Sequence, residues 1–111
     1  MNDYETRALS KVNYSLTTNE RLLEGAMGLC GETGEVVDII KKYMWQGHSL
    51  NLQHLCEELG DILWYVVDTA EAVGLTLDMI QRKNIEKLDK RYPKGFNSEL
   101  SQTRDSREKK I

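Results

Sequence analysis

The feature that most constrains the fold of this 111-residue chain is an apolar pattern with the period of an α-helix. Residues Thr17 to Glu20 match a capping box, in which Thr17 caps the helix and Glu20 reaches back three residues. From there to Gln46-Gly47, apolar residues recur at spacings of three and four on one broad stripe. The stripe expected to face the core consists of Leu22, Leu23, Ala26, Met27, Leu29, Cys30, Val37, Ile40 and Met44. We therefore predict one long core-facing helix.

Further helices are predicted before and after it. Residues 2–12 can form a short helix, and Thr76 can cap a last helix that ends at Tyr92-Pro93. Between them, Ser49 or Asn51 can cap a helix to about Val73, followed by Gly74 as a stop. The middle helix carries the apolar stripe Leu52, Leu55, Cys56, Leu59, Ile62, Leu63, Val66, Val67 and Ala70, and the last carries Leu77, Ile80, Ile85 and Leu88. No segment alternates as a strand does, so the predicted fold is all-α.

Size and composition limit the organisation of the chain. Residues 1–96 are expected to form one domain, and residues 97–111 a polar, disordered tail with almost no apolar content. Because a chain of this length buries little apolar area, assembly into a homodimer or homotetramer is expected. A net charge of -3 disfavours nucleic-acid binding. The sequence shows no membrane span and no signal peptide, which predicts a cytoplasmic protein. Cys30 and Cys56, inside apolar stripes, are expected to be buried free thiols.

Two acidic pairs carry the functional signal. Glu32 and Glu35 lie three residues apart on the first long helix, and Glu58 and Asp61 repeat that spacing on the next. A three-residue step keeps two side chains on adjacent turns of one helical face, so four carboxylates can converge between two packed helices. The alternative is that these are ordinary acids of a solvated surface.

The surroundings of the first pair favour a special face. Gly25, Gly28, Gly31 and Gly34 recur every third residue, although each glycine inside a helix costs about 1 kcal/mol relative to alanine. Close approach by another helix, by a ligand, or by both would offset that cost. A cage made only of carboxylates suits Mg²⁺ or Mn²⁺ rather than Zn²⁺, and Mg²⁺ commonly binds substrate phosphates as well.

The sequence around these acids resembles that of the MazG-like all-α nucleoside triphosphate pyrophosphohydrolases over about residues 20–96. The segments that carry the resemblance are GLCGETGEVVDIIKK, EELGDILWYV and NIEKLDKRYPKGF. The resemblance implies a Mg²⁺-dependent hydrolase that cleaves an NTP or dNTP between the α and β phosphates, releasing a monophosphate and pyrophosphate. It also implies that Glu32, Glu35, Glu58 and Asp61 hold the metal ion. Four-helix arrangements completed by oligomerisation would build each site.

The remaining candidate residues are substrate ligands. The resemblance places phosphate-binding basic residues on the last helix, where Lys83, Lys87 and Arg91 recur every four residues beside Asn84. Trp45 and Lys42, near the end of the first long helix, can stack on a base and reach phosphate. Each of these residues also has an ordinary explanation, as part of an exposed helical face or as a cation near a helix C-terminus.

Two other functions are compatible with a helical bundle carrying acids. One is a non-catalytic interaction module with a vestigial metal site, which the four intact acids disfavour. The other is a di-metal carboxylate protein, which normally adds Glu-x-x-His motifs that this chain lacks. The preferred base and sugar, the physiological role, the choice between dimer and tetramer, and the acid that activates water are not determined by the sequence.

Overall fold

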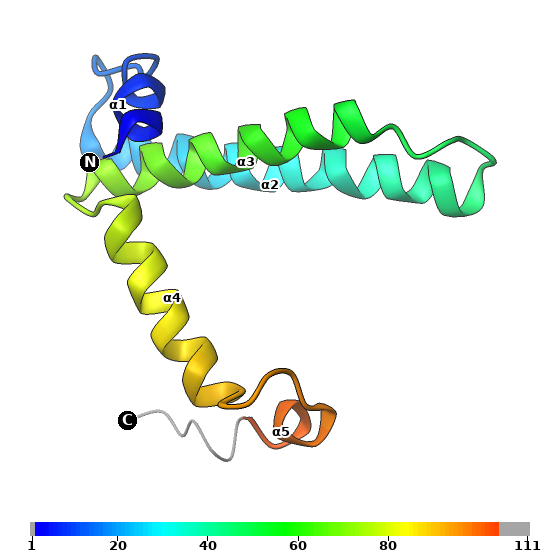
Figure 1. The fold of residues 1–111 in the computed structure, drawn as a ribbon. Coiled ribbons are helices and arrows are strands. Elements are labelled where there is room, and N and C mark those ends of the chain that lie inside the picture. Colours follow the sequence, from blue (N-terminus) through cyan, green and yellow to red (C-terminus); the bar gives the residue numbers. More distant parts are fainter. Residues whose placement is uncertain (1, 105–111) are drawn as a thin grey trace. The chain divides into compact units, whose positions relative to one another are not determined.

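The computed structural model describes residues 2–104, and within this range it contains helices and no strand (Figure 1). The chain divides into two compact units, Met1–Leu77 and Asp78–Ile111, which are described separately. The helices are α1 (Asp3–Leu9), α2 (Thr18–Trp45), α3 (Leu52–Ala72), α4 (Leu77–Arg91) and α5 (Ser98–Gln102). The all-α prediction is confirmed. Within the described residues, no helix combines the length and the apolar content that a membrane span requires.

Side-chain caps fix where the helices of the first unit begin. The Thr17 hydroxyl accepts the backbone N–H of Glu20 at 3.1 Å, and the Glu20 carboxylate accepts that of Thr17 at 2.8 Å. This is the predicted capping box. Asn51, one of two predicted caps for α3, accepts the backbone N–H of His54 at 3.0 Å. The glycines that follow α2 and α3 have positive φ angles, as helix-terminating glycines do.

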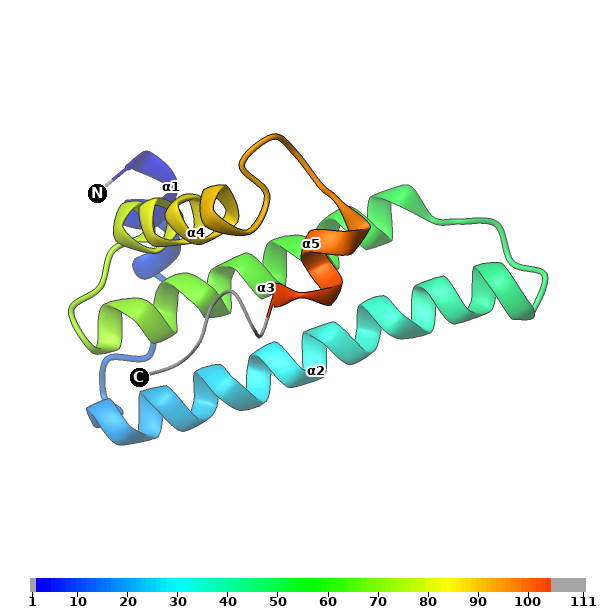
Figure 2. The ribbon, with the colours of Figure 1, turned by 90° about the horizontal axis from the view of Figure 1, so that it is seen from below.

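Helices α2 and α3 pack side by side and antiparallel along most of their length (Figures 1 and 2). Two glycines of α2 set the contact: a methyl group at Gly25 would collide with the side chain of Thr69, and one at Gly28 with the ring of Tyr65. These two glycines therefore allow close helix packing, whereas a Cβ at Gly31 or Gly34 would meet no atom within 4 Å. One half of the glycine series is thus explained within the chain.

A buried charge network locks one end of this helix pair. The guanidinium of Arg21 donates to the Asp68 carboxylate at 2.6 and 3.1 Å, and to the Asp68 backbone carbonyl at 3.0 Å. It also donates to Glu71 at 2.7 Å, and its flat face lies 5.0 Å from the ring centre of Tyr14. Asp68 is almost fully buried. Since a buried carboxylate needs such partners, the network specifies one register between α2 and α3.

Helix α1 packs against α3. The indole N–H of Trp64 donates to the backbone carbonyl of Ala8 at 3.0 Å, so this aromatic residue joins the two helices. Leu9, Val67 and Leu77 form a small buried cluster. The Glu5 carboxylate is buried and accepts the backbone N–H of Leu77 at 2.8 Å.

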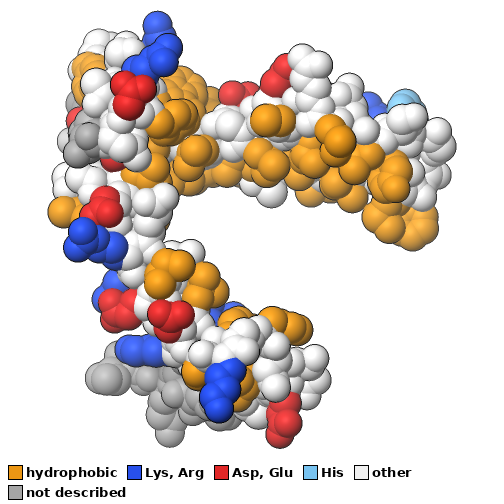
Figure 3. All heavy atoms as spheres, viewed as in Figure 1, with side chains coloured by type: hydrophobic (Ala, Val, Ile, Leu, Met, Phe, Trp, Pro, Cys, Tyr) orange, Lys and Arg blue, Asp and Glu red, His pale blue; other side chains and the backbone are white. Residues whose placement is uncertain are grey.

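The predicted core stripes of α2 and α3 are largely uncovered in the chain alone, which corrects that prediction. Within the first unit, helix α2 packs mainly on α3, and much of its apolar stripe stays exposed. The exposed members are Leu23, Ala26, Met27, Cys30, Val37, Ile40 and Met44 on α2, with Leu52, Cys56, Leu59 and Leu63 on α3. Figure 3 shows hydrophobic side chains gathered along one edge of the helix pair. The two cysteines are free, as predicted, but exposed instead of buried.

The second unit contains α4 and α5. Ile85 and Leu88, predicted to face inward, are exposed on α4 within the chain alone. The rings of Tyr92 and Phe96 pack with centres 5.3 Å apart after the end of α4. In the segment expected to be disordered, Asn97 caps the short helix α5 by accepting the backbone N–H of Leu100 at 3.0 Å. Residues 105–111 of that predicted tail lie outside the described residues.

Candidate metal centre

Three of the four predicted acids converge between α2 and α3. Glu32 comes from α2, and Glu58 and Asp61 come from adjacent turns of α3. One carboxylate oxygen from each lies within 4.8 Å of the other two. Glu32 and Glu58 are half-buried and Asp61 is exposed, so the group opens to solvent on one side. Among residues 2–104, no other group of His, Cys, Asp and Glu side chains meets this geometric condition.

The charges within this group are coupled. A hydrogen bond to Glu58, with partial burial and the negative charge of Glu58, raises the pKa of Glu32 above its ordinary value. Two carboxylates so placed favour a shared proton or a cation between them. A divalent cation relieves the same repulsion more completely, because it neutralises both charges at once.

Glu35, the fourth predicted ligand, is exposed and lies outside the close group. It follows Glu32 by three residues on the same helix, so the two carboxylates start from adjacent turns. The structure therefore brings together three of the four acids and places the fourth at the neighbouring surface.

Two tyrosines and one histidine surround the acids. Burial raises the pKa of Tyr65, and the negative charges of Glu32 and other acids raise it further. Burial and Asp61 likewise raise the pKa of Tyr4, which α1 brings to this region. The Nε2 atom of His54 lies 3.2 Å from the Glu58 carboxylate. The sequence analysis missed Tyr4 altogether, whereas the four-residue spacing of His54 and Glu58 on one helix was available as a signal.

The predicted substrate ligands of the first unit lie at the far end of α2. Lys42 is half-exposed and pairs with Asp38 at 2.9 Å. Trp45, the last residue of α2, is 77% exposed and makes no ring contact among the described residues. Neither belongs to the acid group, and their proposed roles stay predictions.

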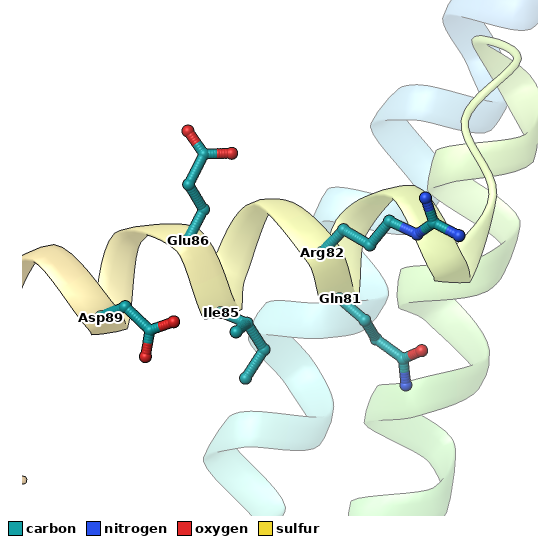
Figure 4. A pocket seen from close by; sticks show the side chains of 5 residues that line it. All are labelled: Gln81, Arg82, Ile85, Glu86 and Asp89. Atoms are coloured by element: carbon teal, nitrogen blue, oxygen red, sulfur yellow. The ribbon is translucent and has the colours of Figure 1, made fainter.

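The other predicted ligands, Lys83, Asn84, Lys87 and Arg91, all lie on α4 in the second unit. Lys83 is highly exposed and pairs weakly with Glu86 at 3.7 Å. A hollow on the same helix is lined by Gln81, Arg82, Ile85, Glu86 and Asp89. Figure 4 shows these side chains pointing to different sides of α4, so they do not converge as ligands of one molecule. The role of α4 in phosphate binding stays a prediction.

The chemistry of the donor set fits a hard cation. The three converging groups offer only carboxylate oxygens, and Mg²⁺, Ca²⁺ and Mn²⁺ prefer such ligands. Zn²⁺ sites favour histidine and cysteine instead. A partly open group of this kind leaves room for a substrate oxygen beside the protein ligands.

Comparison with known proteins identifies the family of the chain. A family model described as the MazG nucleotide pyrophosphohydrolase domain matches residues 18–96. The chain belongs to the MazG family. The match begins at the first residue of α2 and includes all four acids of the predicted site. This match confirms the resemblance to MazG-like proteins that the sequence segments around the acids indicated.

A phage protein is among the relatives of this MazG-family chain. Gene 37 protein of Mycobacterium phage L5 is 34% identical over 73 residues, which cover 62% of this chain and 64% of the phage protein. The chain thus matches less than two thirds of that relative's length. No solved structure matches the chain.

Proposed function

We propose that this chain is a Mg²⁺-dependent nucleoside triphosphate pyrophosphohydrolase, with Mn²⁺ as a possible substitute. It would cleave an NTP or dNTP between the α and β phosphates, giving a nucleoside monophosphate and pyrophosphate. The observation that carries the proposal is the convergence of Glu32, Glu58 and Asp61 within 4.8 Å in a chain of the MazG family. A cytoplasmic location belongs to the same proposal, because nucleoside triphosphates are found there.

In this proposal Glu32, Glu58 and Asp61 hold the ion, and Glu35 joins them as the fourth acid. A bound Mg²⁺ supplies charge neutralisation at the phosphates and lowers the pKa of a water ligand. The protein's own contribution is to fix these carboxylates before substrate arrives, since α2 and α3 are held in one register by Arg21. His54 contacts Glu58 at 3.2 Å and helps to orient its carboxylate.

The assembly completes the proposal. The apolar edge of α2 and α3 carries side chains such as Met27 and Leu59, which are 66% and 51% exposed. Patches of this extent mark interaction surfaces in soluble proteins. A second copy offers the same two-helix edge, and two such pairs form a four-helix arrangement that covers both stripes. We therefore propose a homodimer, or a homotetramer built from dimers.

The test is a nucleotide panel with product identification. Purified protein is incubated with Mg²⁺ and each common NTP and dNTP, and monophosphate and pyrophosphate are quantified. Loss of a group that only orients a metal ligand typically costs about 10- to 100-fold, so loss of a ligand itself in Glu58→Gln or Asp61→Asn should lower activity by at least that much. Glu57→Gln is the matched control, because Glu57 is an exposed acid next to Glu58 that lies outside the group.

Two results would contradict the proposal. One is the absence of monophosphate and pyrophosphate with every nucleotide tested. The other is turnover that Glu58→Gln and Glu57→Gln reduce equally, which would show that the converging acids play no special part. Turnover that does not depend on a metal ion would contradict the assignment of Mg²⁺ but not the assignment of the hydrolase activity.

A further inference from the structure

A second polar feature lies at the turn between α2 and α3. There a cavity of about 180 Å³ is lined by Asp38 and Lys42 of α2, His48 and Asn51 of the turn, and His54 of α3. Most of these side chains carry hydrogen-bond donors. The proposed role of the acid group does not account for this cavity.

The backbone builds the cavity through one glycine. Gly47 has a φ of +75°, which reverses the chain directly after α2. The backbone N–H groups of Gln46 and His48 both donate to the Lys42 carbonyl at 3.1 Å. His48 is therefore held over the same turn of α2 that carries Lys42. The left-handed conformation at residue 47 is the reason these two side chains meet at one cavity.

The donors of the cavity match an oxyanion. The Lys42 ammonium has three N–H donors, of which Asp38 accepts one at 2.9 Å. The Asn51 side-chain oxygen accepts the backbone N–H of His54, which leaves its NH₂ group as a donor. Helix α3 starts at the same place, and the N-terminus of a helix favours negative charge. Asp38 is the one carboxylate in the lining, and it already has the lysine as its counter-ion.

The cavity adjoins the acid group. His54 lines the cavity, and its Nε2 atom lies 3.2 Å from the Glu58 carboxylate. Four residues of α3, about 6 Å of rise, separate the two residues. A molecule that extends from the acid group into the cavity would therefore meet two kinds of protein group. At the acid group it would lie beside carboxylate oxygens, which suit a cation, and in the cavity beside hydrogen-bond donors, which suit an anion.

We infer that this turn cavity holds the terminal phosphates of the substrate, and then the pyrophosphate they become, through Lys42 and His48. The inference deepens the proposed function and rests on it for the link between the acids and the cavity. Pyrophosphate binding itself, however, is measurable without catalysis. The polyphosphate would share Lys42 with Asp38, since the ammonium group has donors for both.

Calorimetric titration with inorganic pyrophosphate in the presence of Mg²⁺ tests this inference. Lys42→Gln should weaken binding about tenfold or more, as expected for loss of a hydrogen bond to a charged group. Lys41→Gln is the matched control, because Lys41 is adjacent, has the same charge and also faces Asp38, at 3.5 Å, but does not line the cavity. That control should bind within about twofold of the unmodified protein. His48→Gln, a change in an exposed turn residue, gives a second variant if Lys42→Gln fails to fold.

The outcomes separate this inference from the proposed function. If Lys42→Gln and Lys41→Gln weaken pyrophosphate binding equally, the effect is general electrostatic attraction and the inference is overturned. The inference is also overturned if the unmodified protein does not bind pyrophosphate. If nucleotides are hydrolysed but Lys42→Gln changes neither KM nor inhibition by pyrophosphate, the inference fails while the function stands. If no nucleotide is hydrolysed but binding depends on Lys42 and His48, the function fails and the anion site stands. Loss of binding in Lys87→Gln alone would place the phosphates at α4 and overturn the inference.

Discussion

Glu32 on α2 and Glu58 on α3 bring carboxylate oxygens within 4.8 Å of each other, and the interaction with Glu58 raises the pKa of Glu32. Such a pair is stable only with a proton or a cation to offset its charge. The relationship links the chemistry of the site to the stability of the whole helix pair. It also gives the acid group a signature that is measurable without any substrate.

The first prediction concerns pH and metal ions. Because the pKa of Glu32 is raised in the native state, its contribution to stability is full below the unfolded-state pKa and is lost as pH rises through the native value. Mg²⁺ replaces the proton, so it should raise the Tm more at pH 7.5 than at pH 5. Thermal unfolding at both pH values, with and without Mg²⁺, measures this effect. Glu58→Gln should diminish the difference, and an equal Mg²⁺ effect at both pH values would contradict the prediction.

The second prediction concerns the glycines of α2. Gly25→Ala and Gly28→Ala should each destabilise the protein by about 1 kcal/mol or more, because the new methyl group collides with Thr69 or Tyr65. Gly31→Ala should instead stabilise it by about 0.5 to 1 kcal/mol, since no atom lies near the added methyl and alanine favours the helix. Chemical denaturation of the three variants gives the comparison. The same sign for all three would show that the described packing of α2 on α3 is wrong.

The third prediction concerns the Arg21 network. Arg21→Met should cost about 3 to 5 kcal/mol, because it leaves the buried Asp68 carboxylate without its partner. One Asp68 oxygen already lacks a hydrogen-bond partner among the described residues. Arg21→Met combined with Asp68→Leu should recover much of that loss, since neither charge is then buried. Urea unfolding of the single and double variants measures the coupling, and simple additivity would argue against the network.

The fourth prediction concerns the apolar edge of α2 and α3. Leu59→Glu places a charge on the exposed stripe and should shift the protein toward monomer in sedimentation velocity. Leu75→Glu is the control, because Leu75 is similarly exposed, at 46%, but lies after α3 and outside the stripe. The proposed interface would be contradicted if the unsubstituted protein is a monomer. It would also be contradicted if Leu59→Glu and Leu75→Glu shift the protein toward monomer to the same extent.

The sequence predicted the local structure well because each signal was local. The capping box at Thr17, the cap at Asn51 and the stop at Gly74 depend only on residues a few positions away, and all three are present. The helical period also identified α2 and α3 correctly. The missed α5 depended on a single cap, Asn97, in a segment with little apolar content.

What the sequence could not predict depends on neighbours in space. The apolar stripe of α2 was interpreted as core, but periodicity gives the direction of a stripe and not the chain that covers it. Cys30 and Cys56 were misplaced for the same reason. Within the acid site, spacing predicted that four carboxylates can converge, whereas the register set by Arg21 and Gly28 brings three together and leaves Glu35 outside.

The α2–α3 pair also has a consequence for how the protein folds. Glu32 and Glu58 lie 26 residues apart, on two helices joined by a short turn from Gln46 to the cap Asn51, so their meeting needs contacts only within one helical hairpin. Local contacts of this kind form fast, because little chain entropy is lost before they are made. The acid group can therefore assemble early, from one continuous hairpin, and divalent cations present during synthesis can bind and stabilise that hairpin before the rest of the chain is in place.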